Sequence, residues 1–151
     1  MLPKQFFNNE EKHSMSQSVI AIDYGNKRVG IARASVVARL PETLVTLENN
    51  SNLMSSIQNI IDKEDVSVVV VGLPRSLEGS DTEQTKKTRN FIEQLRELAV
   101  EVVEQDEAVT SEHAISELQQ SKNKFVKSDV DQLAALYILE DYFSDLGVNN
   151  R

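Results

Sequence analysis

One aspartate lies where a buried strand is predicted to reach the surface, and its position is the first indication of chemistry. Asp23 ends the apolar run 19–22 and opens a turn of Tyr, Gly and Asn. Its carboxylate is able to hold a divalent metal ion, and an anion at the same turn would meet Lys27 and Arg28. Aspartate is also common at such turns because it bonds nearby backbone, so a structural role stays open.

A second acidic position lies near the start of the last apolar segment. Ser128 and Asp131 have the spacing of a helix-capping residue and its acidic partner. The residues around Asp131 are strongly apolar, and a carboxylate buried among them is costly unless it meets a cation. Capping and metal binding are both consistent with this pattern.

Two further segments carry polar residues directly after predicted strands. Asp106 and Glu107 follow the apolar residues 100–103, although acidic pairs before helices are frequent because they complement the helix dipole. Arg75 lies in a loop with two glycines after the run 66–71. Such loops at the carboxyl ends of parallel strands bind ligands in open α/β sheets, but glycines serve turn geometry more often.

The elements that must position these residues follow from hydrophobic periodicity. Three strands in succession, followed by alternating helices and strands, indicate one α/β domain with a mixed sheet, antiparallel on one side and parallel on the other. A last helix that is apolar over a wide arc is predicted to be central to packing. The predicted strands are 19–22, 29–32, 42–47, 66–71 and 100–103, and the predicted helices are 53–61, 82–98, one from about Thr110, and 129–146.

Composition restricts the chemistry. The chain has 151 residues, 40% of them hydrophobic, which suits a single domain with a substantial core. It lacks cysteine, and its two histidines offer no zinc-ligand spacing, so oxygen ligands are the expected metal chemistry. The net charge of −8 argues against an extended nucleic-acid footprint, but basic residues gather between Lys27 and Arg39 and again at Lys122, Lys124 and Lys127.

The polar residues 1–17 are expected to form a poorly ordered leader, since they lack the apolar core of a secretory signal. Residues 18–146 are the predicted domain and residues 147–151 a flexible tail. No segment is long and apolar enough to cross a bilayer, so we expect a soluble, cytoplasmic protein that does not bind membranes. Met15 is a hypothetical alternative start, which would make the residues before it dispensable.

Four motifs in order along residues 18–143 give the chain a specific resemblance. They are Asp-Tyr-Gly-Asn-Lys-Arg-Val-Gly-Ile-Ala from Asp23, Val-Val-Gly-Leu-Pro ending at Pro74, Asp106-Glu107 with a following Thr-Ser, and Asp-Gln-Leu-Ala-Ala from Asp131. The pattern resembles the YqgF family of RNase H-like nucleases, whose members are assigned to pre-16S rRNA processing or to Holliday junction resolution.

The resemblance implies an RNase H-like α/β fold, in which a five-stranded mixed sheet is flanked by helices. It implies a nuclease that hydrolyses phosphodiester bonds with Mg²⁺ or Mn²⁺ held by Asp23, Glu107 and Asp131, with Asp106 as the reserve for Glu107. Candidate phosphate contacts are Lys27, Arg28 and Arg75. The implied substrate is the 5′ end of 16S rRNA precursor, with branched DNA as the alternative, and the protein would act as a monomer or homodimer.

One departure from the family pattern keeps other functions open. The family segment Asp-Glu-Arg-Leu-Thr has Ala108 in place of arginine here, which removes a cation suited to bidentate phosphate contact. A catalytically silent rRNA-binding assembly factor is therefore one alternative. The Asp-Tyr-Gly turn is also similar to that of sugar kinases and actin-like ATPases, but those enzymes pair two related domains, for which this chain is too short.

Overall fold

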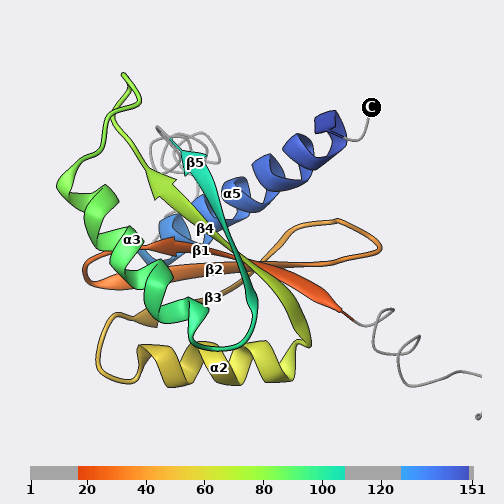
Figure 1. The fold of residues 1–151 in the computed structure, drawn as a ribbon. Helices are drawn as coiled ribbons and strands as arrows, with labels where there is room; N and C mark the ends of the chain where they lie inside the picture. Colours follow the sequence, from red (N-terminus) through yellow and green to blue (C-terminus); the bar gives the residue numbers. More distant parts are fainter. Residues whose placement is uncertain (1–16, 108–126, 150–151) are drawn as a thin grey trace, which may run out of the picture.

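The computed structural model describes residues 17–107 and 127–149. These residues form one sheet with helices on both of its faces (Figure 1). The expected leader, the expected helix from Thr110, Ala108 and the lysines at 122 and 124 lie outside the described residues. The elements are β1 (Ser18–Tyr24), β2 (Arg28–Ser35), β3 (Glu42–Glu48), α2 (Leu53–Lys63), β4 (Val66–Pro74), α3 (Glu83–Arg96), β5 (Glu101–Glu107) and α5 (Lys127–Asn149).

The sheet has the predicted mixed topology. Its five strands lie in the order β3-β2-β1-β4-β5. β1 pairs antiparallel with β2, which pairs antiparallel with β3, whereas β1, β4 and β5 run parallel. The antiparallel half comes from two short connections, and the parallel half requires the crossover helices α2 and α3. The carboxyl ends of β1, β4 and β5 therefore meet at one edge, where the acidic residues were expected.

Each face of the sheet has its own apolar core, because successive side chains of a strand point to opposite faces. On one face, Ile20 and Ile22 pack with the buried residues of α2 and α3. On the other face, Val19 and Ala21 pack against Ala135, Ile138 and Leu139 of α5. Figure 1 shows this division, with α2 and α3 on one side of the sheet and α5 on the other. We refer below to the α2/α3 face and the α5 face.

Several predicted boundaries are wrong, most clearly at the ends of β4 and β5 and at both ends of α5. β4 continues past Gly72 to Pro74, with Leu73 fully buried. β5 runs through Glu107 because residues 101–107 pair with β4 through backbone bonds that polar side chains do not prevent. α5 begins at Lys127, one residue before the predicted cap Ser128, and extends to Asn149, so residues 147–149 are helical where a flexible tail was expected.

An arginine on the α2/α3 face ties the amino-terminal end of β1 to two neighbours. Arg33 of β2 donates to Ser18 Oγ at 3.0 Å and forms ion pairs with Glu42 at 2.6 Å and Glu64 at 3.2 Å. Its side chain is 25% exposed. These contacts join β1, β2, β3 and the end of α2 at the side of the sheet opposite to the acidic edge.

Membrane insertion by a helix finds no support in the described ranges, since none of their helices combines the length and the apolar character that a bilayer requires.

Candidate active site

Asp23 lies on β1 at the edge where the parallel strands end. It shares the α5 face with Val19 and Ala21, four and two residues earlier on the same strand. Burial disfavours the charged carboxylate, and the negative charge of Asp131 adds to this effect, so that together they raise the pKa of Asp23 to about 7. An acidic side chain close to half protonated at neutral pH is unusual and is typical of functional sites.

Two glycines flank Asp23 in one row across the sheet. Gly30 of β2 is its cross-strand partner, and Gly72 of β4 follows Val71, which pairs with Ile22. A Cβ atom on Gly30 would lie 2.0 Å from the backbone oxygen of Asp131, and one on Gly72 would lie 2.4 Å from Ile138 Cδ1. The helix α5 therefore rests almost directly on the backbone beside Asp23.

This close packing brings Asp131 to Asp23. Ala32 and Ala34 continue the small residues of β2 on the same face, so the first turns of α5 approach the sheet closely. Sequence reasoning selected Asp131 but missed Gly30, although a glycine inside a strand pattern is a recognised sign of close backbone approach. Two of the three predicted metal ligands thus meet on one face.

Glu107, the third predicted ligand, ends β5 on the α5 face. Its Cγ lies 3.7 Å from the position that a Cβ on Gly72 would occupy, so its side chain lies over that glycine, next to the row that contains Asp23. Asp106 alternates to the other side of β5, where it bonds Arg75 and is 67% exposed. Strand alternation therefore selects Glu107 over the reserve Asp106.

Arg28 is bound to one of these carboxylates. Its Nε donates to Asp131 Oδ2 at 2.8 Å, with the two side chains 34% and 19% exposed. The turn that carries Arg28 is well anchored: Gly25 N donates to Arg28 O, and Asn49 donates from Nδ2 to Gly25 O and from its backbone to Lys27 O. The exposed Lys27 lies on the same anchored turn.

The other predicted phosphate contact, Arg75, is held by carboxylates. It forms ion pairs with Asp81 at 2.8 Å and with Asp106 at 3.0 Å, and Arg89 shares Asp81. The Arg89 hydrogen bond is the main reason that the pKa of Asp81 is lowered. Arg75 therefore closes the loop between β4 and α3 and would reach phosphate only by giving up these partners.

The remaining arginines of the amino-terminal basic stretch are also engaged. Arg33 contacts carboxylates on the α2/α3 face, and the Arg39 guanidinium lies over the Phe143 ring at 5.7 Å from its centroid. Three of the four cations of the predicted basic patch, Arg28, Arg33 and Arg39, therefore have partners within the protein, while Lys27 is exposed.

The donor atoms suit a hard divalent cation, but the carboxylates are not gathered into a complete cage. In the part of the chain that the structure describes, no three Asp, Glu, His or Cys side chains are grouped closely enough to hold a metal ion. Asp23 and Asp131 nevertheless interact electrostatically, and a bound cation would reverse the conditions that raise the pKa of Asp23. The Asp23–Asp131 pair therefore fits Mg²⁺ or Mn²⁺. Glu107 lies on β5, the strand that pairs with β4 and its Gly72.

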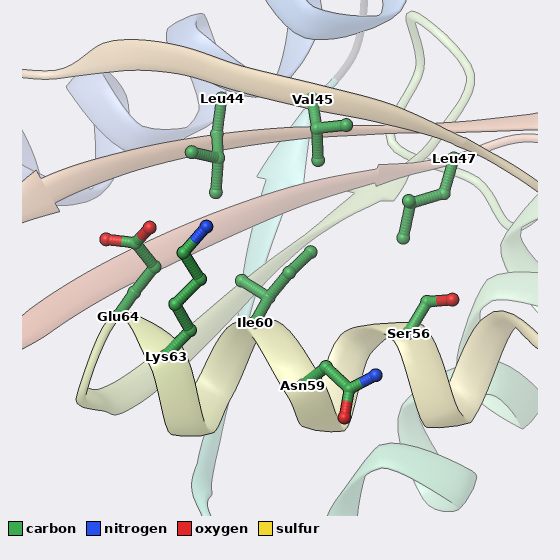
Figure 2. Close-up of a pocket in the computed structure, with 8 residues that line it drawn as sticks. All are labelled: Leu44, Val45, Leu47, Ser56, Asn59, Ile60, Lys63 and Glu64. Carbon is green, nitrogen blue, oxygen red and sulfur yellow. The ribbon is translucent and has the colours of Figure 1, made fainter.

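A separate hollow lies on the α2/α3 face, away from these carboxylates. Figure 2 shows it between edge strand β3 and α2, with a volume of about 370 Å³. Its charged lining residues, Lys63 and Glu64, are of opposite sign, and its walls include Leu44, Leu47 and Ile60. It has neither the acidic donors of a metal site nor a net cationic lining for phosphate.

Comparisons with solved structures confirm the fold. RuvC of Thermus thermophilus in complex with a Holliday junction substrate matches with a TM-score of 0.53 and 13% identity, covering 87% of this chain and 96% of that chain. The Fowlpox virus resolvase in complex with Holliday junction DNA matches with a TM-score of 0.51 and 11% identity, covering 85% of this chain and 98% of that chain. At such identities these likenesses establish the RNase H-like sheet and its helices.

Comparisons with curated sequences reach higher identity over most of the chain. Several relatives are named "Putative pre-16S rRNA nuclease". The relative from Sulfurihydrogenibium sp. (strain YO3AOP1) is 31% identical over 87% of this chain and 93% of its own length. The relative from Nitrosospira multiformis is 34% identical over 89% and 95%, and that from Rickettsia conorii is 36% identical over 81% and 82%.

A family model agrees with these relatives and with the predicted resemblance. The model described as RuvX, Holliday junction resolvase, matches residues 17–145, which include Asp23, Glu107 and Asp131. On this match and on relatives above 30% identity over most of its length, the chain belongs to the RuvX family, also named YqgF.

Proposed function

We propose that this protein is a nuclease that hydrolyses phosphodiester bonds with Mg²⁺ or Mn²⁺ bound at Asp23, Asp131 and Glu107. The observation that carries the proposal is the Asp23–Asp131 pair, in which a desolvated carboxylate with a pKa of about 7 lies beside a second carboxylate at the carboxyl edge of an RNase H-like sheet. Such a pair has little structural use, because two like charges placed together destabilise the fold.

The residues of the chain would contribute in distinct ways. Divalent ions in such a site activate a water molecule and stabilise charge on the phosphate. Asp23 would hold the cation as a carboxylate, since a bound cation would favour its charged form. Glu107 would approach from β5, and the exposed Lys27, next to Arg28 in the sequence, offers a positive charge in the β1–β2 turn.

We propose 16S rRNA precursor as the substrate, because relatives that match most of this chain are named for a nuclease of pre-16S rRNA. Cleavage at its 5′ end is the part of this proposal that rests on the family resemblance alone. A role in ribosome maturation implies a cytoplasmic protein. Branched DNA is the alternative, supported by the description of the family model. A resolvase would act as a symmetric dimer on a junction, whereas a monomer suffices to trim RNA.

The deciding experiment compares substrates and metals. The protein is incubated with precursor rRNA, single-stranded RNA and a synthetic four-way DNA junction, each with Mg²⁺, Mn²⁺ or a chelator. We expect metal-dependent cleavage of RNA. Cleavage of the junction by a dimer, with RNA left intact, would replace the rRNA substrate with branched DNA.

Variants then test the assigned residues. Asp23→Asn and Asp131→Asn should each lower the cleavage rate by at least about 100-fold, because each removes a charged ligand while keeping its shape. Glu107→Gln should lower it as well. Asp106→Asn is the matched control, one residue from Glu107 on the opposite side of β5, and should keep most of the activity. Wild-type rates in both Asp23→Asn and Asp131→Asn would refute the mechanism.

A catalytically silent rRNA-binding factor is a second candidate, favoured by the cation already on Asp131 and by the incomplete grouping of carboxylates in the described ranges. Isothermal titration separates the two functions. RNA binding without detectable Mg²⁺ or Mn²⁺ binding would support the silent factor and exclude the nuclease.

A further inference from the structure

The contact between Arg28 and Asp131 places a cation on a carboxylate that the proposed function needs for metal. Its geometry is that of a strong charge-assisted hydrogen bond, with 2.8 Å between Nε and Oδ2. Both side chains are less exposed than typical surface ion pairs, at 34% and 19%. The two residues are 103 positions apart, so the contact results from the fold and not from local sequence.

Both partners are fixed before they meet. Arg28 begins β2, and its own carbonyl closes the turn by accepting from Gly25 N. The backbone of Asp131 lies against Gly30, two residues along the same strand. Because the two backbones are held, no backbone ordering is required when the pair forms, and only side-chain entropy opposes it.

We propose that Arg28 is a positioning residue that acts as a resident counter-ion of the site: it orients Asp131 in the metal-free protein and competes with the divalent cation for that carboxylate. The inference rests on the proposed function, since it takes Asp131 as a metal ligand. A guanidinium bound to Oδ2 neutralises much of the charge that would attract a cation, whether or not Oδ1 remains accessible. Metal binding therefore weakens the Arg28–Asp131 contact, which leaves the guanidinium beside the site.

Competition and simple structural support predict opposite effects of removing the charge. If Arg28 only supports the fold, Arg28→Gln should bind metal as well as the wild type or more weakly. If Arg28 competes, Arg28→Gln should bind Mn²⁺ more tightly, by about three- to fivefold, the range of a partly exposed ion pair. Glutamine keeps a donor near Asp131 but carries no charge.

The experiment measures Mn²⁺ affinity by isothermal titration of the wild type and of the variants named below, at one pH and one ionic strength. Lys27→Gln is the matched control, because it removes the same charge from the neighbouring, exposed position, and its affinity should stay within about twofold of the wild type. Arg28→Lys, which keeps the charge, should restore the wild-type affinity. The gain from Arg28→Gln should disappear in an Asp131→Asn background. Unchanged or weaker Mn²⁺ binding by Arg28→Gln would overturn the inference.

A measurement on the wild type covers the case in which Arg28→Gln does not fold. The ¹⁵Nε resonance of Arg28 should shift during a Mg²⁺ titration, with the midpoint found by calorimetry, and a resonance that stays in place at saturation would overturn the inference. Cleavage assays run in parallel keep the two proposals apart. Tighter Mn²⁺ binding by Arg28→Gln in a protein that cuts no substrate supports the counter-ion and refutes the nuclease. Cleavage by the wild type, without tighter Mn²⁺ binding by Arg28→Gln, supports the nuclease and refutes the counter-ion.

Discussion

The raised pKa of Asp23 predicts that the metal-free protein loses stability as the pH rises toward neutrality. At low pH the Asp23 carboxyl is protonated in the folded and the unfolded chain, so it has no effect on stability. Above the ordinary value of 3.8 the unfolded chain releases the proton, while the folded protein keeps it until the pH reaches about 7. Between these two pH values the free energy of unfolding therefore falls as the pH rises. Above the higher value the loss of stability stays constant.

The size of the effect follows from the same two values. The interval from 3.8 to about 7 corresponds to roughly 4 kcal/mol in total, at about 1.4 kcal/mol for each unit. Between about pH 5 and about pH 8 the wild type should lose roughly 2 kcal/mol of unfolding free energy. This value allows for relaxation of the site and entry of water, which reduce the effect. Asp23→Asn lacks the ionisable group, so at about pH 8 it should be the more stable protein by roughly 3 kcal/mol.

Urea unfolding followed by circular dichroism measures this effect. Wild type and Asp23→Asn are unfolded with a chelator present at about pH 5 and about pH 8, and the quantity of interest is the difference in free energy of unfolding between the two proteins. Because all other groups titrate in both, the difference isolates Asp23. A millimolar Mg²⁺ supplement should stabilise the wild type at the higher pH and leave Asp23→Asn nearly unaffected. A wild-type-minus-variant difference that is equal at both pH values would refute the reasoning.

Further predictions concern how α5 and β1 are held. Gly30→Ala places a Cβ against the backbone oxygen of Asp131 and should cost about 2–3 kcal/mol of unfolding free energy and weaken Mn²⁺ binding. Gly72→Ala meets side chains rather than backbone, those of Ile138 and, at ordinary contact distance, Glu107, and should cost about 1 kcal/mol; equal costs for the two variants would contradict this account. Arg33→Gln leaves Glu42 and Glu64 without their counter-ion and Ser18 Oγ without its donor. It should lower the unfolding free energy by about 2 kcal/mol without changing metal affinity, as measured by denaturation and calorimetry.

The sequence was informative wherever burial imposes a regular pattern. The alternation and β-branched runs predicted all five strands and the mixed sheet, because the central strands are covered on both faces. It failed at the end of β5, where acidic residues continue the strand. An edge strand is held by backbone bonds to its one neighbour, so Asp106 and Glu107 leave no apolar signal.

For the candidate site, the sequence supplied the residues but not their partners. Asp23 and Asp131 were selected from local context, and the fold brings them together. The partners of Arg28 and Arg75 lie on other elements, 103 positions away for Arg28, and no local pattern encodes such pairs. Both arginines were therefore interpreted as free to bind phosphate, whereas each is engaged with a carboxylate. Ala108 lies outside the described residues. The effect on substrate positioning of alanine in place of the family's arginine therefore stays a prediction.

The division of the acidic pair between the first strand and the last helix has a consequence for biosynthesis. A nascent chain whose α5 is still inside the ribosomal exit tunnel already contains β1, β2 and β4, yet it lacks the Asp131 carboxylate that the proposed cleavage requires. Premature termination before α5 likewise yields a fragment with half of the pair. An enzyme made beside ribosomal RNA would in this way become able to cut it only after α5 has been made and has packed onto the sheet.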